Sequence, residues 1–240
     1  MGTREDEELA GRVLESIKQD KGLSAYEINV RALDGAVHLS GVVDVLVEKM
    51  RAGDIASRVT GVDSVENGLT VCTDGQITDD DVAFEVAEEL RLDNNVDISR
   101  VHGESSKGVV HLHGHVDSLA HERAAITAAA RARGVKEIVS HLAVEGGDRA
   151  DDPGLTSRVQ AAIAAEKRLH PYAISARAER GVVRLEGEVQ SEDQIEIAAE
   201  LVSGVKGVQR IENRLTAPNR KTSAPEEAAQ EIIDAREHNE

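Results

Sequence analysis

Apolar and polar positions alternate along the chain with two periods, and both periods return three times. Leu9, Val13 and Ile17 recur every four residues among charged ones, which predicts an amphipathic helix of about three turns. Residues 28–41 then alternate between apolar and polar positions, the period of strands with one buried face. The positions equivalent to the first helix are Val82, Val86 and Leu90, and then Leu155, Val159 and Ile163. Each third of the chain therefore begins with a helix that is followed by strands.

A two-residue turn interrupts each alternating stretch. Asp34-Gly35 is a strong signal for a β-hairpin, because both turn positions favour positive φ. The later turns are Lys107-Gly108 and Arg180-Gly181. A turn of this length also fixes the register, so we expect Val30 opposite Leu39 and the apolar residues of both strands on one side of the sheet.

The seven residues that begin at Gly35 return almost unchanged at Gly108 and Gly181. They read GAVHLSG, GVVHLHG and GVVRLEG, and a step of 73 residues separates each copy from the next. Such a repeat decides the number of domains before chain length does. A unit of this size can bury its own small core, unlike the short repeats of solenoids, so we expect three linked domains.

A second helix and a third strand complete each unit. Ser191 followed by Gln194 is a capping box, and Asp117-Ser118 offers caps in the middle unit. We expect a glycine in the left-handed conformation to end each second helix. These glycines are Gly61, Gly134 and Gly207. The fold class is therefore α+β, in the order helix, strand, strand, helix, strand, with both helices on one face of a three-stranded sheet.

Glycine also recurs at an inward position of the second strand, where an apolar side chain would be ordinary. The residues are Gly41, Gly114 and Gly187. Glycine within a strand often marks the close approach of another element. We expect a helix to lie close against the sheet at these positions.

The pattern G-V-V-x-L-x-G-x-V of residues 108–116, with a Gly-Val pair before the last strand, resembles the BON family (bacterial OsmY and nodulation domain). The resemblance covers residues 6–71, 79–144 and 152–217, which we take as three BON-like domains, and leaves residues 218–240 as a flexible C-terminal tail. It implies bacterial, envelope-associated binding modules linked to osmotic stress, phospholipid binding and outer-membrane upkeep. Family members usually carry a signal or lipoprotein sequence and one or two copies of the domain, so this chain departs from them on both points.

The segments between the domains, residues 72–78 and 145–154, are expected to let the domains reorient. In the tail, Ala228, Ile232 and Ile233 lie at near-helical spacing, which leaves two interpretations, a solvated tail or a docking helix. A short helix is marginal on its own, so the solvated tail is favoured.

Composition excludes several classes of function. With 45 acidic and 28 basic residues the net charge is −17, which disfavours non-specific binding to nucleic acid or to anionic membranes. One Phe and two Tyr are too few to stack bases. The apolar runs are too short to cross a bilayer, and a single cysteine excludes an internal disulfide. The first residues lack the apolar segment of a signal peptide. We therefore expect a cytoplasmic protein as the sequence is written, and a periplasmic or envelope protein if the native start lies elsewhere.

Candidate catalytic groups do not gather along the sequence. Cys72 has no histidine nearby, no glycine-rich loop precedes a lysine, and the carboxylates are spread over helix surfaces. We expect a non-enzymatic binding or scaffold protein whose partners are phospholipid headgroups or another protein. The sequence indicates no oligomeric state and no cofactor other than a divalent metal ion.

The metal ion is suggested by histidines that are peculiar to the middle unit. Alternation places His111, His113 and His115 on the outer face of the sheet, and the register pairs His102 with His113. We expect Zn²⁺ or Ni²⁺ to bind His102, His113 and either His111 or His115, with His141 added if the third strand lies beside the hairpin. The alternative is that these residues are merely polar groups on an exposed strand, since nothing in the sequence supplies a partner that orients the imidazoles.

Basic residues also concentrate around the second helix of the middle unit. They are Arg123, Arg131, Arg133 and Lys136. One interpretation is a solvated face whose charge favours the carboxyl end of the helix. The other, which the resemblance suggests, is contact with anionic lipid headgroups.

Overall fold

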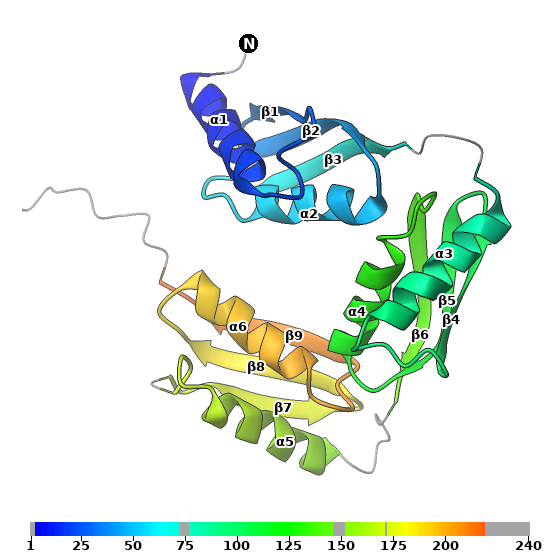
Figure 1. Ribbon diagram of the computed structural model, residues 1–240. Helices are drawn as coiled ribbons and strands as arrows, with labels where there is room; N and C mark the ends of the chain where they lie inside the picture. Colours follow the sequence, from blue (N-terminus) through cyan, green and yellow to red (C-terminus); the bar gives the residue numbers. More distant parts are fainter. Residues whose placement is uncertain (1–2, 73–76, 146–151, 171, 219–240) are drawn as a thin grey trace, which may run out of the picture. The chain divides into compact units, whose positions relative to one another are not determined.

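The computed structural model describes residues 3–72, 77–145, 152–170 and 172–218, and these residues form three sheets of three strands, each with two helices on one face (Figure 1). The first domain comprises α1 (Arg4–Gln19), β1 (Asn29–Leu33), β2 (Ala36–Val43), α2 (Leu46–Ser57) and β3 (Ser64–Val71). The second comprises α3 (Asp79–Leu92), β4 (Val101–Ser106), β5 (Val109–Val116), α4 (Leu119–Ala129) and β6 (Glu137–Val144). The third comprises α5 (Asp152–Ala165), β7 (Ser175–Glu179), β8 (Val182–Glu188), α6 (Glu192–Ser203) and β9 (Arg210–Thr216).

The second strand of each domain is the central one. The hairpin strands are antiparallel, and the third strand returns through the second helix to lie parallel to the central strand. Val30 lies opposite Leu39, as the two-residue turn predicts. Asp34 and Gly35 adopt φ of 49° and 79°, which confirms the hairpin turn. The turns at Lys107-Gly108 and Arg180-Gly181 adopt the same conformation.

The predicted helix stripes supply the cores. Leu9, Val13 and Ile17 of α1 are buried in one cluster with Val37 and Leu39 of the central strand. Fully burying such side chains stabilises a fold by about 1.5–3 kcal/mol each. The equivalent stripes of α3 and α5 are buried as well. The predicted caps form at Ser118 and Ser191, where the main-chain N–H of Ser191 donates to Gln194 Oε1 at 3.3 Å.

The second helices end earlier than the glycines predict. α2 ends at Ser57, and Gly61, although it has a φ of 98°, follows three further residues. The main-chain N–H of Val59 donates to Ala56 and that of Val62 donates to Val59, so tighter turns continue the chain after the helix. The glycine therefore ends this series of turns rather than the helix itself, and Gly134 and Gly207 do the same after α4 and α6.

The inward glycines of the central strands also have a different cause from the one expected. A Cβ on Gly41 would lie 2.6 Å from the main-chain oxygen of Glu27, and one on Gly114 would collide with the main-chain oxygen of Arg100. Both atoms belong to the segment that enters the first strand, not to a helix. Both glycines also have positive φ, 146° and 125°, which disfavours any side chain.

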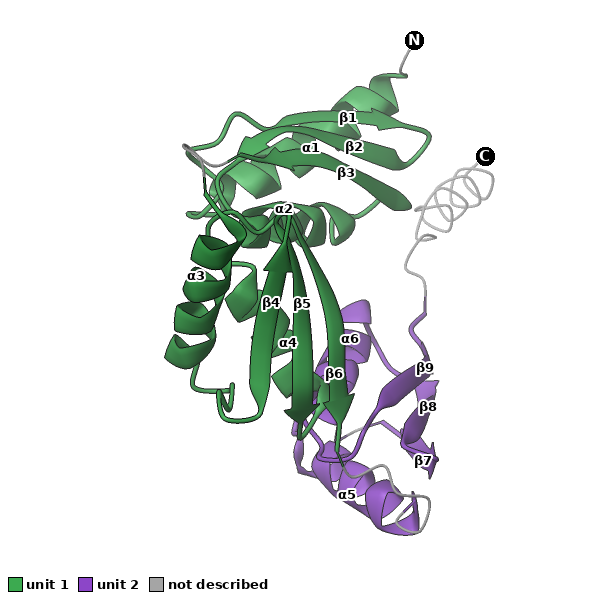
Figure 2. Ribbon diagram, turned by 90° about the vertical axis from the view of Figure 1, so that its right-hand side faces the viewer, with its two compact units in different colours: residues 1–147 green, residues 148–240 purple. Residues whose placement is uncertain are grey.

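The chain divides into two compact units, residues 1–147 and 148–240 (Figure 2). The first unit holds the first two domains, and there Leu46 is buried against the core of the second domain while the main-chain N–H of Val47 donates to Ala130 at 2.9 Å. The predictions for the tail, and for most of both linkers, concern residues outside the described ranges. In the described part of the chain, no helix combines the length and apolar character needed to span a bilayer.

Candidate functional site: the histidine face of the second domain

The face of the second sheet that its own helices leave uncovered carries four histidines. Val110 and Leu112 of β5 point into the core and are fully buried, so His111 and His113 point to the opposite face. His113 lies opposite His102 of β4 on one side and His141 of β6 on the other. These three residues form a row across the sheet. We call His102, His111, His113 and His141 the histidine face.

The four imidazoles stack on one another. The ring centroids of His113 and His141 are 4.9 Å apart with 14° between the ring planes, and those of His102 and His113 are 5.7 Å apart. His111 joins from the next outward position along β5, with its centroid 5.5 Å from that of His141. His111 and His113 are half-buried, whereas His102 and His141 are exposed. The sheet thus presents a nearly continuous imidazole surface.

His115 lies apart from this surface. It pairs with Ala143 at the far end of β5 and lines a separate pocket with Asp117 and His121. Of the two candidates for a third ligand, the structure therefore brings His111 and not His115 toward the other histidines. His141, which the sequence includes only if β6 lies beside the hairpin, does lie there.

Two imidazole nitrogens of the histidine face are close enough to share an ion. His111 Nδ1 and His141 Nε2 are 3.2 Å apart, the distance of a hydrogen bond in which one ring donates to the other. Two nitrogens bound to one tetrahedral zinc at about 2.0–2.1 Å lie at a similar separation. Among the described residues, however, no group of three His, Cys, Asp or Glu side chains is arranged to hold a metal ion. A third ligand requires His113 or another side chain to turn toward this pair.

The same face in the other domains carries side chains paired with a glutamate instead of a cluster of imidazoles. In the first domain His38 Nδ1 lies 3.2 Å from Glu66 Oε2. In the third domain Arg184 lies 3.0 Å from Glu212, and this arginine lowers the pKa of the Glu212 carboxyl. The scaffold is constant while the side chains on its open face differ from domain to domain.

The basic residues of the second domain lie on α4 and in the segment that follows it. Arg123 is on the helix, Arg131 and Arg133 follow it, and Lys136 precedes β6. Arg131 Nη1 lies 3.2 Å from Asp93 Oδ2, so one of the four charges is already paired. Burial raises the pKa of Asp93, but hydrogen bonds from Asn95 and Arg131 outweigh it, and the pKa is lowered. Arg123, Arg133 and Lys136 are exposed.

The three domains match a known protein family. The family described as BON domain matches residues 5–73, 78–146 and 151–219. This chain belongs to the BON family. The osmotically-inducible protein Y of Escherichia coli (strain K12) is 28% identical over 144 residues, which cover 58% of this chain and 72% of that protein.

Two solved structures of CdsD, a structural protein of the type III secretion system of Chlamydia trachomatis, also align with most of the chain. One is 12% identical, covers 95% of this chain and 97% of its own, and has a TM-score of 0.24. The other, of the CdsD C-terminal domain, is 12% identical, covers 88% and 97%, and has a TM-score of 0.25. At these TM-scores neither likeness carries an argument about function.

Each BON domain also contains a carboxylate that no sequence motif singles out. In the second domain Asp79, the first residue of α3, accepts the main-chain N–H groups of Lys107 at 2.8 Å and Gly108 at 3.1 Å. The equivalent carboxylates are Asp6, which accepts from Asp34, and Asp152, which accepts from Arg180. The signal is present in the sequence, since Asp6, Asp79 and Asp152 follow the 73-residue step. These carboxylates tie the first helix to the hairpin turn.

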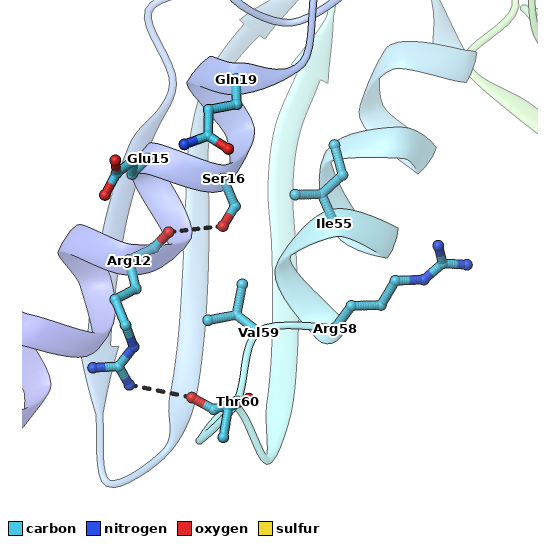
Figure 3. Close-up of a pocket in the computed structure, with 8 residues that line it drawn as sticks. All are labelled: Arg12, Glu15, Ser16, Gln19, Ile55, Arg58, Val59 and Thr60. Carbon is cyan, nitrogen blue, oxygen red and sulfur yellow. Dashed lines mark hydrogen bonds between the residues drawn. The ribbon is translucent and has the colours of Figure 1, made fainter. Parts of the chain in front are cut away.

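A groove in the first domain offers no chemistry beyond packing. It lies between α1 and α2, has a volume of about 590 Å³, and includes Ile55 and Val59 in its lining (Figure 3). Arg12 Nη2 donates to the Thr60 carbonyl at 3.2 Å. Ser16 Oγ donates to a main-chain carbonyl rather than to a side-chain base, so it is not an activated nucleophile.

Proposed function

We propose that this BON protein is a non-enzymatic binding protein that contacts anionic phospholipid through the basic residues of its second domain, in the cell envelope and under stress. The observation that carries the proposal is the placement of those residues. At the positions equivalent to Arg123, Arg131, Arg133 and Lys136 the first domain has Met50, Arg58, Thr60 and Asp63, and the third has Glu196, Gly204, Lys206 and Gln209. The positive group is therefore a property of the second domain, not of the repeat.

The physical basis is attraction between these cations and headgroup phosphates. A basic residue close to an anionic membrane surface contributes about 1 kcal/mol, and the attraction decays within a Debye length. The net charge of −17 opposes approach of the chain as a whole, so binding depends on this group facing the membrane. Binding is therefore expected to weaken sharply as salt is raised.

Binding, rather than catalysis, is the class of function that the site supports. Cys72 is exposed, and the sequence places no histidine next to it. The relative's name, osmotically-inducible protein Y, supports a role under osmotic stress without naming a ligand. If the protein does not bind vesicles, a protein partner is the alternative.

The proposal is tested by sedimentation with vesicles of phosphatidylglycerol and phosphatidylcholine at low and high salt. The variant Arg123→Gln/Arg133→Gln/Lys136→Gln is expected to lower binding to the anionic vesicles on the order of 100-fold. A matched control, Lys18→Gln/Lys21→Gln/Arg31→Gln, removes the same charge from exposed positions of the first domain and is expected to bind nearly as the wild type. If the wild type fails to bind anionic vesicles even at low salt, lipid contact is excluded and a protein partner becomes the proposal.

A second candidate function is binding of Zn²⁺ or Ni²⁺ at the histidine face. The observation that favours it is the 3.2 Å separation of His111 Nδ1 and His141 Nε2 on a surface where His102 and His113 are also within reach. Neutral imidazoles are suitable ligands for both ions, and an exposed face leaves room for water or a partner's ligand.

A further inference from the structure

A tyrosine joins the loop after the first helix to the start of the second helix in two of the three domains. In the first domain the Tyr26 hydroxyl lies 3.0 Å from Asp44 Oδ2 and 2.8 Å from Glu48 Oε1. Burial, together with the hydrogen bond to Glu48, raises the pKa of Tyr26. In the third domain the Tyr172 hydroxyl lies 3.1 Å from both Gln190 Oε1 and Gln194 Nε2.

The second domain lacks this tyrosine. The 73-residue step places Ser99 there, and its hydroxyl donates to Asp97 at 2.6 Å. A pocket of about 190 Å³ lies beside this position. Its lining residues are Asn94, Asn95, Val96, Asp97, Arg100, Val101, His115, Val116, Asp117 and His121. Since a water molecule occupies about 30 Å³ of the liquid, the pocket has room for roughly six waters or for one aromatic ring.

The partners of the missing hydroxyl group are also in place. Asp117 and His121 stand at the positions of Asp44 and Glu48, which hold the Tyr26 hydroxyl in the first domain. His121 Nδ1 is 2.7 Å from Ser118 Oγ, and that hydrogen bond fixes the orientation of the imidazole. The pocket therefore offers a carboxylate that accepts and an imidazole beside it.

Arg100 lines the pocket without filling it. Its Nη1 lies 3.3 Å from Asp117 Oδ1 and its Nη2 lies 2.7 Å from Glu145 Oε2. The volume of about 190 Å³ is what remains with this side chain in place. Arg100 stands where the first domain has Glu27. A positive side chain at this position favours a ligand oxygen, whereas a second carboxylate there would repel it.

We propose that this pocket, the vacant tyrosine position of the second BON domain, binds a small phenol whose ring lies against the half-buried Val96 and whose hydroxyl group hydrogen-bonds with Asp117 and His121. The phenol is either a free molecule or the side chain of a tyrosine in a peptide. Both present the same phenol group. In the other two domains a tyrosine of the chain itself supplies that group. The inference does not depend on lipid binding.

The test is a titration of the full chain with p-cresol, the side-chain analogue of tyrosine, followed by amide NMR and calorimetry. We expect a Kd on the order of 1 mM, as for a ligand of eight non-hydrogen atoms, with shifts centred on Val116 and His121. Toluene, which lacks the hydroxyl group, is expected to bind at least about tenfold more weakly. N-acetyltyrosinamide distinguishes the sources: binding at least as tight as that of p-cresol indicates a peptide, and much weaker binding indicates a free phenol.

The variant Ser99→Tyr fills the pocket from within and is expected to abolish p-cresol binding, while Ser99→Ala removes the same hydroxyl without filling it and retains binding. Circular dichroism checks that both variants fold. If Ser99→Tyr does not fold, the location of the wild-type amide shifts decides the matter. The proposal is overturned if p-cresol does not bind, if toluene binds equally, or if the shifts lie away from this pocket.

Discussion

The Asp79 carboxylate holds the turn of the β4–β5 hairpin, accepting the main-chain N–H of Lys107 at 2.8 Å. Lys107 has a φ of 55°, a conformation that glycine and asparagine adopt more readily than lysine does. The contact joins the first turn of α3 to a hairpin 28 residues later. One carboxylate thus positions the helix and stabilises a strained turn at the same time.

Asp79→Asn is expected to lower the melting temperature by a few degrees, because Lys107 and Gly108 donate to different carboxylate oxygens and asparagine keeps only one of these two acceptors. Asp80→Asn, which changes the neighbouring exposed carboxylate, is the control and is expected to have little effect. Thermal unfolding at pH 7 measures both. Equal melting temperatures for the two variants would contradict this role for Asp79.

The same contact predicts a pH dependence. The hydrogen bonds from Lys107 and Gly108 lower the pKa of Asp79 in the folded state. Its contribution to stability is therefore complete above the unfolded pKa, near 4, and is lost as the pH falls through the lower folded value. The difference in stability between wild type and Asp79→Asn should be constant from pH 7 to about pH 4 and shrink below it. A difference that grows on acidification would refute this assignment.

Gly114→Ala is expected to be strongly destabilising, by about 2 kcal/mol or more, because the new Cβ meets the Arg100 main-chain oxygen at a φ of 125°. Gly11→Ala is the matched control. Gly11 lies in α1, and a Cβ added there would meet nothing within 4 Å, so alanine should stabilise the protein by about 0.5–1 kcal/mol. Urea unfolding measures both variants, and similar effects of the two would show that the inward glycines are not required by this close approach.

Calorimetric titration with Zn²⁺ or Ni²⁺ tests the histidine face. His102→Ala/His113→Ala is expected to weaken binding at least roughly tenfold, since it removes two imidazoles from the row across the sheet. His38→Ala/His170→Ala removes two histidines from the other domains and serves as the control. Acid should release the metal, because a protonated imidazole has no lone pair to donate. Equally weak binding by wild type and both variants would mean that the histidines are only polar surface groups.

Much of each domain follows from local chemistry in the sequence. The turn at Asp34-Gly35 fixes the pairing of Val30 with Leu39, because a two-residue hairpin leaves no freedom of register. The same logic pairs His102 with His113. The row continues to His141 only because β6 lies parallel to β5, and strand order across a helical crossover is decided by packing, not by a local motif.

The errors have equally specific causes. The glycine after α2 predicts a helix end at Gly61, but main-chain bonds such as Val59 to Ala56 tighten the chain after Ser57. At Gly41 the neighbour is the main chain of Glu27, which no side-chain pattern reports. The carboxylate of Asp79 acts across the domain, so its role appears only once α3 and the hairpin are placed together.

Lipid binding by the second BON domain is tested most directly by the amide NMR spectrum of the full chain with nanodiscs of anionic phospholipid. If the domain binds lipid through Arg123, Arg133 and Lys136, the largest changes should fall on residues 123–136. The equivalent residues 50–63 and 196–209 should change little, and the effect should disappear with neutral nanodiscs or at high salt. Changes spread evenly over the three equivalent segments, or no changes at low salt, would contradict lipid binding through this group.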